Sequence, residues 1–228
     1  MKKIKVFSLV LCLGIILTGC NNTQKGAAIG TGGGALLGAI VGKLAGNTAV
    51  GAAVGAGAGA IIGKKMDKAK AQAEAVKNAQ VQTVTDANGL QAVKVTFDSG
   101  ILFSTGSATL AASAKSSLQQ FSDVLKSNTG CDVSIQGYTD NQGWKNSTAE
   151  QSIQKNKDLS YSRASSVSTY LKSLGVSAAQ IKSVNGYGQD NPVADNSTAA
   201  GQAQNRRVEI YLYASEAMIK QAEAEAGR

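Results

Sequence analysis

The sequence of 228 residues contains no histidine, one proline and one tryptophan, and only 5% of its residues are aromatic. Without an imidazole, the chain cannot build a Ser-His-Asp or Cys-His catalytic group or a histidine-ligated zinc site. The remaining residues show no pairing of a nucleophile with a base and no cluster typical of a metal site. We therefore expect a protein that is not an enzyme and that uses no cofactor and no metal.

Basic residues exceed acidic ones, with 23 Lys and Arg against 15 Asp and Glu, but the excess is confined to one part of the chain. The first 80 residues contain ten lysines against Asp67 and Glu74, so residues 81–228 hold 13 basic and 13 acidic side chains. Nucleic-acid binding by bulk phosphate attraction requires a basic surface. We therefore expect no nucleic-acid partner for the neutral C-terminal part.

The N-terminus is predicted to be a signal peptide at residues 1–19. Three lysines within the first five residues precede an apolar run at 6–17, which is too short to span a bilayer. The run ends in Leu-Thr-Gly-Cys at 17–20, which resembles the bacterial lipobox. That resemblance implies cleavage after residue 19 and attachment of fatty acids, palmitate among them, to Cys20, followed by a tether at 20–25. An uncleaved anchor is the weaker alternative.

Cys131 is then the remaining thiol, because Cys12 leaves with the signal peptide and Cys20 holds the lipid. It alternates with Val133 and Ile135 in a strand-like run, so we expect its side chain in the core as a small hydrophobic group. No intramolecular disulfide is expected.

Residues 26–63 hold 13 of the 26 glycines, most of them at every fourth position. On a helix this spacing forms a smooth stripe that allows close backbone approach, as in membrane helix pairs. It predicts a glycine-zipper hairpin with arms at 26–46 and 49–63, which associates with the membrane or packs on itself; a flexible linker has no reason to keep the period. Residues 64–80, charged and rich in alanine, are predicted to form a helical linker that stands as a stalk between membrane and domain.

Residues 81–213 are predicted to form one α+β domain, with helices packed on one face of a mixed sheet. The turn at 86–89 includes an Asn-Gly pair and predicts a hairpin. Apolar periodicity predicts strands at 81–85, 90–97, 131–138, near Val184 and at 206–213, and helices at 110–126 and 159–174. The tail at 214–228, rich in alanine and glutamate, is predicted to be a solvated helix or a frayed end.

Several motifs resemble the OmpA-like C-terminal domain family: Gly137-Tyr138-Thr139-Asp140, Leu159-Ser160 with Arg163-Ala164, Gly186-Tyr187-Gly188 with Asn191-Pro192, and the run from Asn205 to Ile210. The resemblance covers about residues 90–213 and implies a β-α-β-α-β fold. With the lipobox and glycine zipper in front, the chain is similar to outer-membrane lipoproteins of this family. The family binds peptidoglycan non-covalently through the diaminopimelate of the stem peptide.

The end of diaminopimelate presents an ammonium and a carboxylate on one carbon. The resemblance assigns Asp140 to the ammonium and Arg163 to the carboxylate, which a guanidinium can bind with two hydrogen bonds. The residues themselves add that Leu159, Arg163 and Val167 share one helical stripe, so that Arg163 faces the core and needs an anion. A structural ion pair between Asp140 and Arg163 is the alternative.

The same resemblance implies further ligand-binding residues. Thr139 flanks the aspartate, and Ser104 and Thr105 align with a loop that supplies backbone N–H groups. Asn156 corresponds to an asparagine beside the pocket, with a helix N-cap as an equal alternative.

Two features of these motifs stay open. The segment from Gly143 to Asn156 is longer than the family pattern and is predicted to form a longer lip over the site. Its Trp144 either stacks on sugar or fills a gap in the core. Arg206 and Arg207 belong to the last motif, where a structural role is at least as well supported as binding.

Together these features predict a lipoprotein that anchors the outer membrane to peptidoglycan, with its domain in the periplasm and with acylated Cys20 and residues 26–63 as contacts to the lipid bilayer. One alternative makes the zipper the active part, as an envelope assembly factor or a segment that forms homo-oligomers. An enzyme with Asp140 and Glu150 as a glycosidase pair is the weakest alternative.

Overall fold

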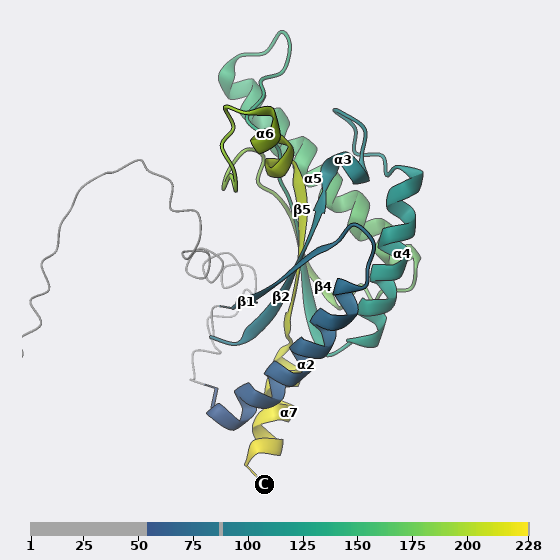
Figure 1. The fold of residues 1–228 in the computed structure, drawn as a ribbon, viewed down its shortest axis with the longest axis vertical. Coiled ribbons are helices and arrows are strands. Elements are labelled where there is room, and N and C mark those ends of the chain that lie inside the picture. The colour runs from purple at the N-terminus through teal and green to yellow at the C-terminus, as the bar shows by residue number, and fades with distance from the viewer. Residues whose placement is uncertain (1–53, 87–88, 228) are drawn as a thin grey trace, which may run out of the picture.

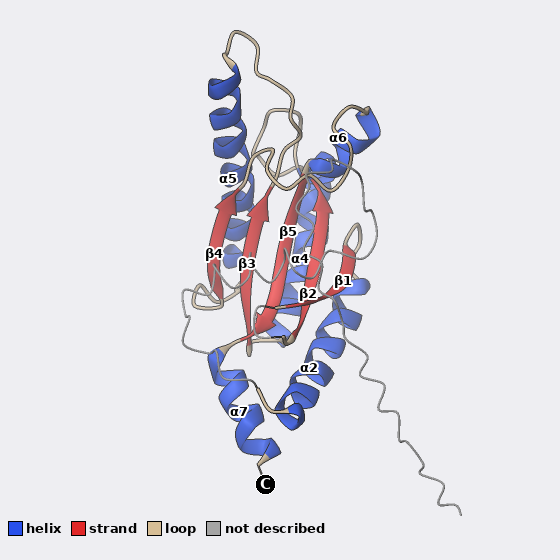
Figure 2. Cartoon of the chain, turned by 90° about the vertical axis from the view of Figure 1, so that its left-hand side faces the viewer, coloured by secondary structure: helices blue, strands red, loops and turns tan. Residues whose placement is uncertain are grey.

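The computed structural model describes residues 54–86 and 89–227. Its centre is a five-stranded sheet with strand order β1-β2-β5-β3-β4 (Figure 2). β3 and β4 pair in parallel, and the other neighbouring strands pair antiparallel. The strands are β1 (Gln80–Thr85), β2 (Gln91–Asp98), β3 (Cys131–Gly137), β4 (Ile181–Gly186) and β5 (Arg207–Ala214).

The long helices α2, α4 and α5 cover one face of this sheet (Figures 1 and 2). Alternate strand residues such as Val95, Phe97 and Ile210 point into the core between the two layers, where Phe121 of α4 packs edge-on against Phe97. The α+β class with a mixed sheet is thereby confirmed. The helices are α2 (Ala56–Glu74), α3 (Ser99–Leu102), α4 (Ala112–Ser127), α5 (Ala149–Ser173), α6 (Ala199–Asn205) and α7 (Glu216–Ala226).

The first hairpin forms as its turn residues predict. β1 and β2 pair from Gln80 opposite Thr96 to Thr85 opposite Gln91. Gly89 adopts a φ of 76°, a conformation that favours glycine, and Asp86 Oδ1 accepts the Leu90 N–H. The predicted strand at 131–138, the helix at 110–126 and the last strand are likewise present, with ends shifted by one or two residues.

The predicted stalk at 64–80 is helical over its first part, but it does not stand apart from the domain. α2 buries one face, with Ala58, Ile62, Met66, Ala69 and Ala73 at 1% exposure or less. This face packs against β1, β2, α4 and α7. The stalk prediction is therefore wrong, because alanine next to one methionine and one isoleucine is enough to build a packed face.

The glycine stripe of the predicted second zipper arm contributes little to this packing: among its described members, only Gly63 lies near the sheet, where an added Cβ would be 3.6 Å from Gln91 Oε1. A Cβ added at Gly55 or Gly59 would meet no atom within 4 Å, whereas Ile62 lies in the core. The face of α2 that contacts the domain is therefore its alanine, isoleucine and methionine face.

Two other helices differ from the prediction. α5 begins at Ala149, ten residues before the expected start, because Thr148 and Gln151 form a reciprocal capping box. The tail forms α7, capped by Ser215, and its Met218 and Ile219 join the core. The prediction of a frayed or solvated tail is therefore wrong, since the helix packs against α2.

The predicted signal peptide, Cys20, the tether at 20–25 and zipper residues 26–53 lie outside the described residues. Within residues 54–86 and 89–227, no helix combines the length and the apolar character needed to cross a bilayer.

Candidate functional site

The candidate site lies where β3 ends and β5 begins. These strands are antiparallel neighbours, so residues just after β3 lie beside residues just before β5. Asp140 and Arg206 meet there, and Arg206 Nη1 donates to Asp140 Oδ2 at 2.5 Å. The other carboxylate oxygen accepts the Gln142 N–H at 3.1 Å. The alternative of an Asp140–Arg163 ion pair is therefore wrong: the partner is Arg206.

Arg163 projects from α5 into the same end of the molecule and is only 3% exposed. Its Nε donates to Ser107 O at 2.9 Å and its Nη2 to Ser104 O at 3.5 Å. The guanidinium also lies over the ring of Phe103, 5.3 Å from its centroid. Among the described residues, no carboxylate forms an ion pair with Arg163. A buried guanidinium whose hydrogen bonds go only to backbone carbonyls still lacks an anion.

The charges of Arg206 and Asp140 both affect the pKa of Arg163. The pKa of Arg163 is lowered, mainly because burial disfavours its charged form and also because the Arg206 charge repels it; the Asp140 carboxylate opposes both effects. Two guanidiniums and one carboxylate leave the site with a net positive charge. Such a site favours a ligand that brings a carboxylate of its own.

The predicted loop residues do approach this site, but with different atoms. Ser104 and Thr105 are exposed on the loop between α3 and α4, and the loop contacts Arg163 through carbonyl oxygens. Thr139 is buried, and its hydroxyl donates to the Asp140 carbonyl at 2.8 Å. The structure thus brings Ser104 and Thr139 to the site, whereas Thr105 makes no hydrogen bond to Arg163 or Asp140 within the described residues. Contacts of all three with a ligand remain predictions.

Asn156 lies two turns into α5 and is buried. The N-cap alternative is wrong, because Thr148 caps this helix. The Asn156 Oδ1 accepts the Trp144 Nε1–H at 2.8 Å, and its Nδ2 donates to Gln142 O at 3.1 Å. Both ends of the amide therefore hold the lip that follows Asp140.

Two glycines allow α5 to pack closely against the ends of β3 and β4. Gly137 of β3 and Gly186 of β4 face each other across the parallel pair. A Cβ on either glycine would collide with α5 backbone atoms, at Ser160 for Gly137 and at Tyr161 for Gly186. Each glycine therefore marks a close approach of strand and helix.

The two arginines of the last motif have different roles. Arg207 points to the face of the sheet opposite the long helices. There its Cζ lies 3.8 Å from the centroid of the Tyr138 ring, and its Nε lies 2.8 Å from Glu209 Oε1. Arg206, with 38% of its side chain exposed, reaches the site. Arg207 is thus structural, and Arg206 is a site residue that the sequence left undecided.

These features agree with the comparisons. Residues 102–206 match the model of the OmpA family, and residues 1–67 match that of the YMGG-like Gly-zipper. The chain carries an OmpA-family domain. The match includes Asp140, Arg163 and Arg206, whereas all of α2 and all of α7 lie outside it. Residues 56–67 belong both to the zipper match and to the helix that completes the domain's core.

Known proteins similar to the OmpA-family domain include two curated relatives and a solved structure. The probable lipoprotein YiaD of Escherichia coli is 41% identical over 112 residues, which are 49% of this chain and 47% of YiaD. The peptidoglycan-binding protein ArfA of Mycobacterium tuberculosis is 39% identical over 112 residues, 49% of this chain and 32% of ArfA. The chain thus spans about half or less of these relatives.

The solved structure is that of the cell wall anchor of the T6SS from Pseudomonas aeruginosa. It is 27% identical, has a TM-score of 0.52, and covers 66% of this chain and 97% of its own. The described sheet and helices therefore follow a fold that is already known from experiment.

Proposed function

We propose that the chain is an outer-membrane lipoprotein whose OmpA-family domain binds peptidoglycan non-covalently and ties the membrane to the wall. The observation that supports this most is the buried Arg163 guanidinium, which has no carboxylate partner among the described residues and lies near Asp140. The names of the relatives point the same way: ArfA is a peptidoglycan-binding protein, YiaD is a probable lipoprotein, and the solved structure is a cell wall anchor.

The proposed ligand is the diaminopimelate of the stem peptide, which ends in an ammonium and a carboxylate on one carbon. Its carboxylate would bind Arg163, where Nη1 donates to no described residue. Its ammonium would share the Asp140 carboxylate with Arg206, since each carboxylate oxygen can accept two hydrogen bonds. In this arrangement the ligand supplies the anion that the buried guanidinium lacks.

The arrangement of the two ends of the molecule suits a tether. The strand ends that hold the site lie at one end of the long axis, beside α6 (Figure 1). The start of α2, which is the described element nearest in sequence to the predicted lipid attachment at Cys20, lies at the other end. A domain built this way would face the wall with one end and the membrane with the other.

We infer that the domain binds without catalysis. A glycosidase needs one carboxyl group that stays protonated near neutral pH, with a raised pKa. Glu150 is exposed in the first turn of α5, and hydrogen bonds from its own backbone and from Thr148 lower its pKa. Asp140 is already paired with Arg206, so neither carboxylate is suited to act as the acid.

Sedimentation of the full-length chain with purified sacculi tests the binding. Asp140→Asn and Arg163→Gln should each reduce the bound fraction strongly, about tenfold in affinity or more, because each leaves a ligand charge unpaired. Lys145→Gln, on the adjacent lip, is the matched control and should bind as the wild type does. Equal binding by the wild type and the Asp140→Asn, Arg163→Gln double variant would overturn the site.

The ligand itself is tested with two kinds of wall. Lysine is diaminopimelate without the second carboxylate, so sacculi with lysine in the stem peptide keep the ammonium but lose the group proposed for Arg163. We expect binding to diaminopimelate sacculi and a loss with lysine sacculi. Equal binding to both would leave wall binding intact and remove the diaminopimelate assignment.

A further inference from the structure

Trp144 is the single tryptophan of the chain, and its position is not explained by core packing. It belongs to neither cluster of buried hydrophobic side chains, nor to the apolar residues that pack against them. The residue is partly exposed, and its hydrogen bonds and cation–π contact are made with Ser152, Lys155 and Asn156. Tryptophan usually contributes to stability by burial, so a tryptophan that lies outside the hydrophobic core is expected to have another role.

The ring is nevertheless fixed in place. The Trp144 backbone N–H donates to Ser152 Oγ at 3.0 Å, and Nε1–H donates to Asn156 Oδ1 at 2.8 Å. Lys155 Nζ lies 5.9 Å from the ring centroid. Because the one donor of the indole is used inside the protein, what the side chain can offer a ligand is the flat apolar surface of its ring. A ring already held rigid loses little entropy when it binds.

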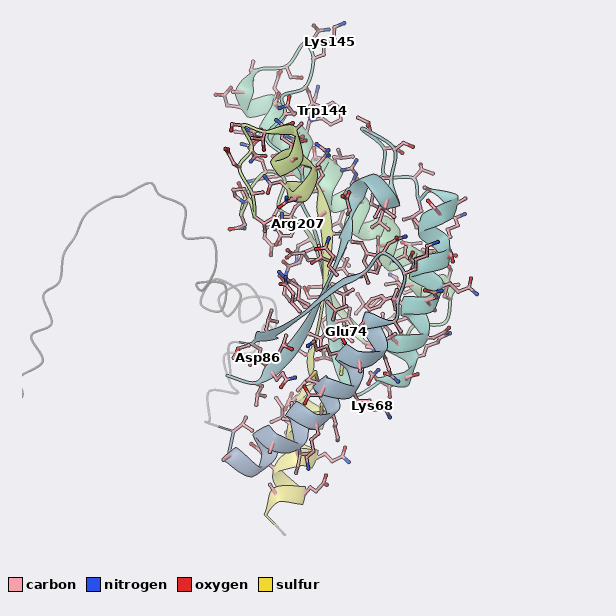
Figure 3. All side chains as sticks on the ribbon, in the orientation of Figure 1. Lys68, Glu74, Asp86, Trp144, Lys145 and Arg207 are labelled. Atoms are coloured by element: carbon pink, nitrogen blue, oxygen red, sulfur yellow. The ribbon has the colours of Figure 1, made fainter. Side chains whose placement is uncertain are left out.

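The lip that presents Trp144 is tied directly to the site. Gln142 donates its N–H to Asp140 Oδ1 at 3.1 Å and accepts from Asn156 Nδ2 on its carbonyl at 3.1 Å. Figure 3 shows Trp144 at the end of the molecule opposite Lys68 of α2, the end where the candidate site lies. The ring is therefore linked through Asn156 and Gln142 to the carboxylate proposed to bind the stem peptide.

We propose that Trp144 is a stacking surface for a sugar ring of the glycan strand, so that the domain recognises the disaccharide as well as the stem peptide joined to it. The inference rests on the proposed function, since it takes peptidoglycan as the ligand. A pyranose ring presents C–H groups on one face, which pack against an aromatic ring while the hydroxyl groups stay in water. The indole supplies such a face, and its polar edge is already satisfied by Asn156.

The test compares two soluble wall fragments: the disaccharide that bears a diaminopimelate stem peptide, and the same peptide released from its sugars. Calorimetry on the full-length chain gives the affinity for each. We expect Trp144→Ala to weaken binding of the sugar-bearing fragment about tenfold and to leave the free peptide unchanged. Trp144→Phe should keep part of the difference, because a smaller ring still stacks. In the wild type, the emission of this tryptophan should shift with the sugar-bearing fragment and stay unchanged with the peptide.

Tyr161, which is 54% exposed on α5, supplies the matched control, and Tyr161→Ala should bind both fragments as the wild type does. Binding of the free peptide also reports that the Trp144→Ala variant is folded. An equal loss for both fragments would make Trp144 a support of the lip, and no loss for either would leave it without a role in binding; both results overturn the inference and spare the proposed function. Failure of the wild type to bind either fragment would instead remove the proposed function, and this inference with it.

Discussion

Replacing Gly137 with alanine would test whether the close approach of α5 to the strand ends builds the site. An alanine Cβ at this position would lie 2.8 Å from the Ser160 carbonyl carbon and would overlap its oxygen. Carbon atoms in contact lie about 3.5–4.0 Å apart, so α5 or β3 must move by about 0.7 Å or more. The neighbour is helix backbone and cannot rotate away, as a flexible side chain could.

The size of the effect follows from this overlap. Overpacking of a dense interior costs about 1–3 kcal/mol, and each kcal/mol lowers Tm by about 2–4 °C in a domain of this size. We therefore expect Gly137→Ala to lower Tm by about 2–12 °C. Binding to sacculi should weaken as well, because Gly137 lies three residues before Asp140, and Ser160 lies three residues before Arg163 on α5.

Thermal unfolding followed by circular dichroism at 222 nm measures the shift, and the same samples are then tested with sacculi. Gly59→Ala is a control of opposite sign, because the added methyl group meets no atom within 4 Å. Alanine there should raise the stability of α2 by up to about 1 kcal/mol. If Gly137→Ala kept the Tm and the sacculus binding of the wild type, the argument that this glycine sets the position of α5 would be refuted.

Two further predictions concern the core. The Met66 side chain in α2 has 0% exposure, so Met66→Ala should lower the free energy of unfolding by about 2–5 kcal/mol and lower Tm accordingly. Lys68→Ala, at an exposed position on the same helix, should change the free energy of unfolding by no more than about 0.5 kcal/mol. Equal Tm values for the two variants would show that α2 is not part of the cooperative fold. Burial, foremost, raises the pKa of Cys131 to about 12 from an ordinary value of 9.0, so its thiol should resist alkylation at pH 8 in the native protein and react once the protein is unfolded. The folded state keeps this proton to higher pH than the unfolded chain does, so the stability contributed by the protonated Cys131 thiol should be lost as pH rises from about 9 to about 12. Rapid alkylation of the native protein at pH 8 would contradict the burial of this thiol.

The sequence predicts the elements whose own residues alternate clearly between apolar and polar. β3 and β5 show period two, and α4 shows a stripe that includes Leu118, Phe121 and Leu125, all of them buried. The α2 face was harder to recognise, because three of its five buried residues are alanines, which favour a helix in water just as they fill a tight contact. Its packing depends on α7, and neither helix shows from its own sequence that the other is present.

The early start of α5 had a readable signal. Thr148 and Gln151 have the spacing of a capping box, and the structure shows both of its hydrogen bonds. The apolar period alone did not reveal this start, because the first turns of α5 extend past the sheet and have few core residues. A polar segment can therefore be helical where a cap begins it and a buried segment continues it.

The sequence motifs named two of the three charged residues of the candidate site, but not the ion pair between Asp140 and Arg206. Asp140 and Arg163 came from motifs, whereas Arg206 is 66 residues from Asp140 along the chain. Their contact depends on the strand order, which places β5 beside β3. Periodicity within one segment says nothing about which strands become neighbours, so the ion pair could be inferred only once the sheet was known.

The strand order also explains why the site holds an unpaired guanidinium. Because β3 and β5 are antiparallel neighbours, Arg206 reaches Asp140 and pairs with its carboxylate, which forms no ion pair with Arg163. Arg163 then donates hydrogen bonds to carbonyl groups alone, in a position where burial already disfavours its charge. Filling that position with a ligand carboxylate would relieve this cost, so the same pairing that stabilises Asp140 without ligand favours an anionic ligand at Arg163. In the proposed role, Arg206 would thus pair with Asp140 while Arg163 receives the carboxylate of the ligand.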